Sequence, residues 1–163
     1  MGGSEPKRAP RLPPRWFIRG AWVVHRAIHR FTGGRRGLAT PIPGGRFGYL
    51  RLRTVGRRSG QERAAILGYC EDGSNLVTLA MNGWADAEPA WWLNLQSHPD
   101  AMVELKTGTR AVRARAAEGE ERARLWALVR GYTGYGDNVD AYAGLRSSET
   151  AVVVLEPRPK SER

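Results

Sequence analysis

The feature that most constrains the fold is a succession of short, strand-length segments separated by tight turns. Phe47 to Val55 alternates between apolar residues and arginines, and the glycine-bounded turn Gly56 to Gly60 leads into a second apolar segment, Arg63 to Cys70. The pair Asp72-Gly73 is typical of a hairpin turn and precedes a third segment, Asn75 to Met81. The pattern therefore predicts three consecutive antiparallel strands joined by hairpins.

The second half of the chain continues the same pattern. A further hairpin is predicted from Ala101 to Lys106 and from Thr109 to Ala116, and a buried strand, Thr150 to Leu155, follows near the end. Two helices are predicted between these strands: Pro89 to Gln96, with proline in its first turn, and Glu118 to Val129, whose acidic start suits the helix dipole. Six short strands with inserted helices predict a mostly antiparallel six-stranded barrel of the α+β class.

The length of 163 residues suits a single domain. We expect a barrel domain over residues 46–157, preceded by a basic tail, an amphipathic helix and a linker over residues 1–45, and followed by a short tail, 158–163. No segment reaches the roughly 20 apolar residues that a membrane-spanning helix needs, and the polar, proline-rich start is unlike a signal peptide. We therefore expect a cytoplasmic protein.

The net charge of +10 is concentrated near the N-terminus. Residues 1–63 contain fifteen Lys or Arg against two Glu, a balance of +13, whereas the remaining residues carry a balance of −3. This distribution predicts an anionic partner, which is nucleic acid, an acidic membrane surface or a polyanionic cofactor. Nucleic acid is disfavoured, because the Trp-rich segment has helical core spacing and lies away from the basic part of the chain.

A helical period runs from Trp16 to Phe31, with apolar residues on one face and Arg15, Arg19, Arg26 and Arg30 on the opposite face. Two interpretations remain open. In the first, the helix packs on its own domain. In the second, it lies in an anionic membrane surface with its arginines at the lipid phosphates, which would place the protein peripherally on the inner face of the plasma membrane.

The usual side-chain catalysts are absent from the sequence. It has no GxSxG, HExxH, Walker A or GxGxxG motif, and its single cysteine, Cys70, excludes a disulfide framework. The histidines, including the pair His25 and His29, do not complete a zinc site, so no metal is expected. If the chain is an enzyme, a bound cofactor is expected to carry the reaction while the protein supplies binding and orientation.

The arginine-rich turn after the first strand is the best candidate for a cofactor site. Its glycines let backbone N–H groups converge on an anion, and Ser59 adds a hydroxyl. Arg57, Arg58 and Arg63 carry forked donors that match phosphate oxygens. The alternative is an exposed hairpin tip with solubilising charge. Arg63 favours the anion site, because it returns to the same end of the sheet after the turn.

Two aromatic segments are candidates for a neighbouring pocket. Leu79 to Trp84 contains the end of a strand and a glycine turn, and Pro89 to Leu95 carries two adjacent tryptophans. Together they could enclose a planar ring, with Asn94 as a polar anchor. The alternative is that the tryptophans are ordinary core residues. The loop Tyr132 to Tyr135, with Tyr142 nearby in sequence, could roof such a pocket.

These segments together resemble the deazaflavin-dependent nitroreductase family, the small actinobacterial reductases that use coenzyme F420. The resemblance covers about residues 47–157, and the order and spacing of its blocks are specific: TVGRRSGQERAAILGY, LVTLAMNG, EPAWWLNLQSHPDAMVELKTGTRAVRARAAEGEERARLW and AVVVLEP. The basic amphipathic segment before them is also similar to the family's N-terminal region. The resemblance implies a split β-barrel, like that of flavin mononucleotide (FMN)-binding proteins, that binds the reduced deazaflavin and passes a hydride to a quinone or nitro compound.

The resemblance also implies which residues form the site. It places the cofactor phosphate at the arginine turn, the ring along the second strand, the ring edge at the backbone after the third strand, and a further cofactor wall on the first barrel helix, with tyrosine facing the acceptor. In that order, the residues are Arg57, Arg58, Ser59 and Arg63; Ala64, Ala65, Ile66, Leu67 and Gly68; Leu79, Ala80, Met81 and Asn82; Ala90, Trp91, Trp92, Leu93 and Asn94; and Tyr135, together with Tyr132. Tyr135 or solvent would deliver the proton that completes quinone reduction.

The sequence departs from the family at two places. Met81-Asn82 stands where relatives often have Ser or Asn followed by Lys or Tyr, and Gly68 stands where some relatives have a tyrosine. In a regular strand Tyr69 would point to the other face. Both departures affect the choice of acceptor more than cofactor binding. Two other functions remain open: an FMN-dependent oxidoreductase on a similar barrel, and a non-catalytic basic binding module.

Overall fold

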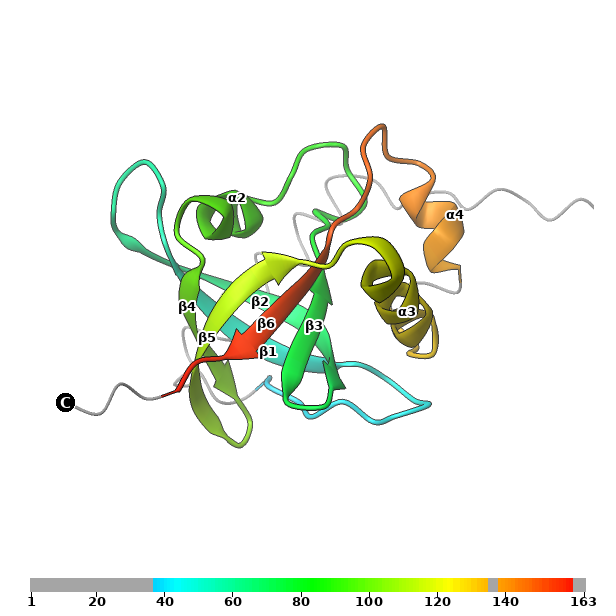
Figure 1. Ribbon diagram of the computed structural model, residues 1–163, viewed down its shortest axis with the longest axis horizontal. Helices are drawn as coiled ribbons and strands as arrows, with labels where there is room; N and C mark the ends of the chain where they lie inside the picture. The colour runs from blue at the N-terminus through cyan, green and yellow to red at the C-terminus, as the bar shows by residue number, and fades with distance from the viewer. Residues whose placement is uncertain (1–36, 135–137, 160–163) are drawn as a thin grey trace, which may run out of the picture.

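The computed structural model describes residues 37–134 and 138–159. In this part of the chain six strands form one closed barrel with the order β1-β2-β3-β6-β5-β4, and all its strand pairs are antiparallel (Figure 1). The expected mostly antiparallel six-stranded barrel of the α+β class is confirmed. The strands are β1 Gly48–Val55, β2 Glu62–Asp72, β3 Asn75–Leu79, β4 Asp100–Leu105, β5 Gly108–Ala116 and β6 Val152–Pro157.

Several strand ends differ from the expected ones by one or two residues, and two of these differences have identifiable reasons. β3 ends at Leu79, two residues early, because the N–H of Met81 turns back to the carbonyl of Leu79. β6 begins at Val152 rather than at Thr150, whose side chain and carbonyl accept hydrogen bonds from outside the sheet. The chain therefore leaves the sheet early at β3 and enters it late at β6.

The interior of the barrel is apolar, and one of its ends is closed by a helix. Alternate residues of each strand point inward, among them Leu50, Leu52 and Tyr69. Helix α2, Ala90–Ser97, lies across the upper end in Figure 1 and buries Trp91, Trp92 and Leu95 against this interior. Both tryptophans therefore pack as core residues, which was the alternative interpretation of this segment.

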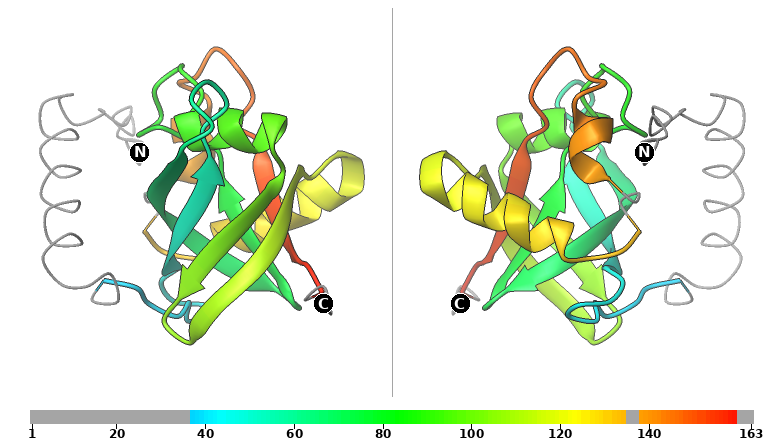
Figure 2. Two further views of the ribbon diagram at one scale, coloured as in Figure 1. Left: turned by 90° about the vertical axis from the view of Figure 1, so that its left-hand side faces the viewer. Right: turned by 90° about the vertical axis from the view of Figure 1, so that its right-hand side faces the viewer.

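Helix α3, Gly119–Arg130, covers the outer face of β3 and β6 (Figure 2). Its Leu125 and Val129 pack against Val77, Val152 and Val154. Since β6 also contributes Val153 and Leu155 to the barrel interior, both of its faces are covered. This explains why the final strand is an uninterrupted apolar run.

A short helix, α4 Val139–Ala143, was not expected from the sequence. It has a little over one turn, which is too short for a hydrophobic period to be recognised. Its start is fixed by Asn138, whose side-chain oxygen accepts a hydrogen bond from the N–H of Ala141. The predicted helix from Trp16 to Phe31 and the candidate Tyr135 lie outside the described residues.

The elements that carry the candidate site residues meet at one end of the barrel. In Figures 1 and 2 the turn between β1 and β2, helix α2 and the loop between β3 and α2 all lie at this end. Within residues 37–134 and 138–159, no helix is long and apolar enough to cross a membrane.

Candidate functional site

The turn between β1 and β2 has a defined backbone conformation. The N–H of Gly56 donates to the carbonyl of Gln61 (2.8 Å), and the N–H of Gly60 donates to the carbonyl of Gly56 (2.8 Å). Gly60 has a φ of +67°, a conformation that favours glycine. A Cβ on Gly56 would lie 2.9 Å from the Ser59 hydroxyl oxygen and 3.0 Å from the Gln61 carbonyl oxygen, so a side chain at this position would crowd the turn. The sequence therefore encodes one particular loop rather than a flexible tip.

Asn94 fastens this turn to helix α2. Its side-chain oxygen accepts hydrogen bonds from the backbone N–H of Arg57 (3.1 Å) and from Nη1 of the same residue (3.4 Å). Its side-chain nitrogen donates to Oγ1 of Thr54 (3.2 Å), the last inward-facing residue of β1. Asn94 is 5% exposed, and both ends of its amide are occupied by protein groups. The structure therefore places it under the turn as an anchor for Arg57.

The exposed side of the turn presents several hydrogen-bond donors. The backbone N–H groups of Arg58 and Ser59 donate to no group among residues 37–134 and 138–159. Within this range the Arg58 guanidinium makes no ion pair, and the Arg63 guanidinium has one hydrogen bond, to the Ser59 hydroxyl (3.4 Å). Adjacent N–H groups at a turn, together with two guanidinium groups, form a donor set that suits an anion.

The nearest acidic side chain does not cancel this positive field. Glu62 follows the turn directly, and its carboxylate accepts a hydrogen bond from Arg53 (2.6 Å). That hydrogen bond is the main reason why the pKa of Glu62 is lowered. Because Arg53 neutralises Glu62, the charges of Arg58 and Arg63 remain available to a ligand. The exposed side of the turn therefore keeps a net positive charge.

The proposed ring-lining strand, β2, divides its residues between two faces. Leu67 and Ala65 face the barrel interior, where Leu67 is buried. Ala64, Ile66 and Gly68 face outward; Ala64 is exposed, while Ile66 and Gly68 are half-buried. Only these three can line a ligand on the outer face with their side chains or, at Gly68, with the backbone.

Gly68 makes room for an aromatic ring. A Cβ at this position would lie 2.6 Å from the Phe47 ring, and one at Gly134 would also meet that ring. Phe47 is therefore held between β2 and the loop that contains Tyr132. Tyr69 points into the barrel interior, as expected for the residue next to Gly68, and burial raises its pKa to about 12.

The loop after β3 offers fewer free backbone donors than expected. The N–H of Ala80 donates to the carbonyl of Ala151, and that of Met81 donates to Leu79. Asn82 pairs with Ala85 across a tight turn, and the N–H of Gly83, within that turn, has no acceptor in the described part of the chain. Leu79 and Ala80 are buried, whereas Asn82 is exposed. If this loop contacts a ligand, the N–H of Gly83 is its available backbone donor.

Helix α2 likewise turns only part of its surface outward. Ala90 is exposed and Leu93 is half-buried, whereas Trp91 and Trp92 are buried in the barrel interior. The helix can therefore form a cofactor wall through Ala90 and Leu93, while its tryptophans hold it in place.

Tyr132 lies at the opposite end of β1 from the arginine turn. Thr133 pairs with Arg46, just before β1, whereas Arg57 follows the end of β1. β1 has eight residues, so about 26 Å of strand separates the two positions. Tyr132 is 7% exposed, packs with Val129 and Phe47, and has a pKa raised by burial.

Sequence reasoning did not identify two polar residues that shape this end of the barrel. Thr54 is buried beneath Asn94, and the buried Arg146 contacts the loop after β3. A polar residue at an inward strand position was the available signal for Thr54. No local pattern marks Arg146, which lies 66 residues from Ala80. Among the described residues, no group of three His, Cys, Asp or Glu side chains could hold a metal ion.

Sequence comparisons identify proteins related to this chain. A family model described as F420H(2)-dependent quinone reductase matches residues 22–157. The Mycobacterium tuberculosis (strain ATCC 25618 / H37Rv) protein Rv3178, which is provisionally named an F420H(2)-dependent quinone reductase, is 32% identical over 128 residues. The match covers 75% of this chain and 96% of the relative.

Solved structures show the same barrel. The F420-H2 dependent reductase FDR-A has a TM-score of 0.59 and 26% identity, over 73% of this chain and 96% of that one. A chain described as a domain-swapped dimer has a TM-score of 0.62 and 23% identity, over 85% and 99%. A heme-binding protein from Mycobacterium smegmatis has a TM-score of 0.53 and 19% identity, over 76% and 50%. The last two resemblances concern the fold alone.

Proposed function

The chain belongs to the F420H(2)-dependent quinone reductase family, whose oxidoreductases use coenzyme F420, and from this premise we propose that it transfers a hydride from the reduced cofactor to a quinone held beside it. The observation that carries the proposal is the arginine turn. Asn94 fixes its backbone, while two N–H groups with no acceptor in the described residues, and the guanidinium groups of Arg58 and Arg63, lie on its exposed side. This donor set fits the cofactor's phosphate.

The arrangement along β2 supports a binding direction. Arg63 follows the turn at the start of the strand, and Gly68 lies five residues further, next to the ring of Phe47 and the loop of Tyr132. We propose that the phosphate lies at the Arg63 end and that the deazaflavin ring extends over Ala64 and Ile66. The ring edge would then meet the backbone near Asn82, and α2 would form the wall at Ala90 and Leu93.

The chemistry is divided between cofactor and protein. Reduced F420 supplies the hydride when it is bound, and the protein's part is to orient it and to exclude water. Tyr135 is proposed to face the acceptor and to supply a proton to the reduced quinone. Tyr132, being buried with a raised pKa, is proposed to support the loop from below.

Stopped-flow mixing of the purified protein with reduced F420 and menadione tests this function. We expect the visible absorbance of oxidised deazaflavin to appear at a rate proportional to protein concentration. A nitroaromatic acceptor in the same assay tests the proposal that nitro compounds also accept the hydride. If fluorescence titration shows no F420 binding and the protein does not catalyse the oxidation of reduced F420, the proposal is wrong. Protein purified yellow with flavin fluorescence would instead favour FMN.

Replacing Arg58 with alanine tests the phosphate site. Because Arg58 has no partner among the described residues, we expect stability to stay within about 0.5 kcal/mol of the wild type. The dissociation constant of F420 should rise about tenfold or more, since a charge-assisted hydrogen bond contributes about 1.5–3 kcal/mol. Arg124→Ala is the matched control: it removes another exposed guanidinium, paired with Asp72, and should leave F420 affinity unchanged. Equal affinities in both variants would contradict the assignment.

We also propose that the basic segment from Trp16 to Phe31 binds anionic membranes, on the basis of its sequence pattern. Co-sedimentation of the full chain with vesicles measures this. The wild type should co-sediment with anionic vesicles. A variant in which Arg19, Arg26 and Arg30 are replaced with glutamine should stay in the supernatant. Equal pelleting of both proteins, or equal binding to zwitterionic vesicles, would discard a membrane role for these arginines.

A further inference from the structure

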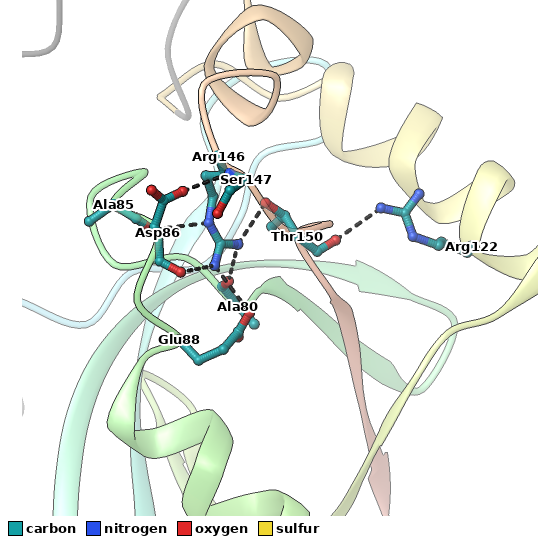
Figure 3. A network of polar contacts seen from close by, with 8 residues as sticks. All are labelled: Ala80, Ala85, Asp86, Glu88, Arg122, Arg146, Ser147 and Thr150. Atoms are coloured by element: carbon teal, nitrogen blue, oxygen red, sulfur yellow. Dashed lines mark hydrogen bonds and ion pairs between the residues drawn. The ribbon is translucent and has the colours of Figure 1, made fainter.

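Arg146, in the loop between α4 and β6, is fully buried: its side chain has 0% exposure. Figure 3 shows its guanidinium reaching into the loop that joins β3 to α2. Its Nε donates to the carbonyl of Ala85 (3.0 Å), and Nη1 donates to the carbonyl of Ala80 (3.1 Å) and to Oγ1 of Thr150 (2.8 Å).

The remaining nitrogen completes this set. Nη2 donates to Oε1 of Glu88 (3.1 Å) and to the carbonyl of Asp86 (3.4 Å). A guanidinium has five N–H groups, and Arg146 therefore finds an acceptor for each of them. Four of the five acceptors belong to residues 80–88, the loop between β3 and α2. One side chain from the C-terminal part of the chain thus gathers three carbonyls and one carboxylate of this loop.

Two further contacts join the same parts of the chain. The N–H of Ser147 donates to Oδ1 of Asp86 (2.6 Å), and the rings of Trp84 and Tyr142 stack with their centroids 6.0 Å apart. The loop needs such support, because Gly83 and Trp84 have φ values of +58° and +63°. For tryptophan this left-handed conformation is strained and persists only where surrounding contacts impose it.

The choice of arginine is better explained by geometry than by stability. A buried ion pair gains little over a well-packed apolar residue, and the second oxygen of Glu88, Oε2, is buried with no partner among the described residues. A planar fork, in contrast, fixes the relative positions of several carbonyls at once. The network therefore suits a requirement for one loop conformation.

We propose that Arg146 is a positioning residue for the cofactor site: it holds the loop between β3 and α2 so that the N–H of Gly83 faces the ring edge of the deazaflavin. This inference rests on the function proposed above for that loop. Arg146 itself is buried and does not touch the ligand. Its effect is exerted through the backbone of residues 80–88.

Arg146→Lys and Thr150→Val test the inference, with Arg115→Ala as the matched control. Lysine keeps the charge but cannot form the fork, and valine removes one acceptor. Arg115 makes a comparable network with Glu121 and Glu156, away from this loop, so its loss affects stability alone. Each protein is measured without cofactor by amide hydrogen exchange of peptides covering residues 79–88, and then by F420 fluorescence titration.

In Arg146→Lys we expect amide exchange in this peptide and the F420 dissociation constant each to rise about tenfold, the equivalent of one charge-assisted hydrogen bond. Arg115→Ala should change neither. If Arg146→Lys binds F420 and exchanges like the wild type, the inference is overturned while the proposed function stands. If Arg146→Lys does not fold, Thr150→Val decides. A rise of about threefold in amide exchange and in the F420 dissociation constant supports the inference, and no change in either overturns it. A wild type that does not bind F420 overturns both proposals.

Discussion

At the scale of single residues, Asn94 links secondary structure to the candidate site. Its amide has one acceptor oxygen and one donor nitrogen, and the structure uses them on different elements: Arg57 in the turn and Thr54 in β1. A buried amide that loses its partners is costly, so this residue ties the position of α2 to the shape of the turn.

Asn94→Ala is therefore expected to lower the free energy of unfolding by about 1–3 kcal/mol, because it leaves the Thr54 hydroxyl and the Arg57 N–H without their partners. It should also weaken F420 binding by loosening the turn. Urea unfolding and fluorescence titration measure the two effects. Ser97→Ala, which removes one exposed contact to the Leu93 carbonyl on the same helix, is the control and should cost less than about 0.5 kcal/mol. An Asn94→Ala protein as stable as this control would refute the anchoring role.

At the scale of elements, α3 and α2 have separate tasks. α2 closes the barrel end where the candidate site lies, whereas α3 covers β3 and β6 from outside. Arg124 on α3 also pairs with Asp72 at the end of β2, and Arg115 on β5 pairs with Glu121 on α3. Helix α3 is therefore structural, and its packing can be weakened without affecting the proposed phosphate site.

Leu125→Ala should make this division measurable. Leu125 is fully buried between α3 and the barrel, so truncation is expected to cost about 2–5 kcal/mol of stability. The F420 dissociation constant should be unchanged at temperatures where the variant is folded. Ala127→Ser, on the exposed side of the same helix, is the control for stability. A large loss of F420 affinity in Leu125→Ala would show that the two helices do not act separately.

At the scale of the whole molecule, carboxylates paired with cations or N–H groups set the acid limit of stability. The Arg115 guanidinium lowers the pKa of Glu121, and the Arg124 guanidinium lowers that of Asp72. The backbone N–H of Ser147 lowers the pKa of Asp86, and the indole N–H of Trp126 followed by Arg130 lowers that of Asp140. Because these pKa values are lower in the folded state, stability is full above the unfolded pKa values and is lost as the pH falls through the folded ones.

We therefore expect the free energy of unfolding to be constant from about pH 5 to 7 and to fall below about pH 4. Glu121→Gln should flatten part of this acid decline. Glu120→Gln, at the neighbouring exposed position without an ion pair in the described residues, should not. Urea unfolding at a series of pH values measures the curves, and identical acid slopes for both variants would contradict the role given to the Arg115 pair.

At alkaline pH the free energy of unfolding changes in the opposite direction, falling as the pH rises. Burial raises the pKa of Tyr69 and of Cys70 to about 12, so these groups stay neutral in the folded protein after they would ionise in the unfolded chain. Stability is then full below about pH 9 and is lost as the pH rises toward 12. Tyr69→Phe should reduce the steepness of this loss in the same unfolding series, and an unchanged slope would argue against its burial as the cause.

The sequence by itself determined the barrel and the arginine turn, because both depend on signals between near neighbours. Alternating residues in β1 and β2, the glycines of the turn and the Asp72-Gly73 hairpin act within a few positions of one another. The donor set at Arg58 and Arg63 follows directly from that local hairpin. The short helix α4 escaped prediction, because one turn carries too little periodicity.

Only the tertiary structure decided which residues of the candidate set turn outward and which support them. It buried Trp91 and Trp92 in the barrel, placed Asn94 under the turn, and brought Arg146 to a loop 66 residues earlier in the chain. These placements result from packing and from the need to satisfy buried polar groups, which couple residues far apart in sequence. A linear pattern carries no record of such pairs, so the supporting residues became visible only in the folded chain.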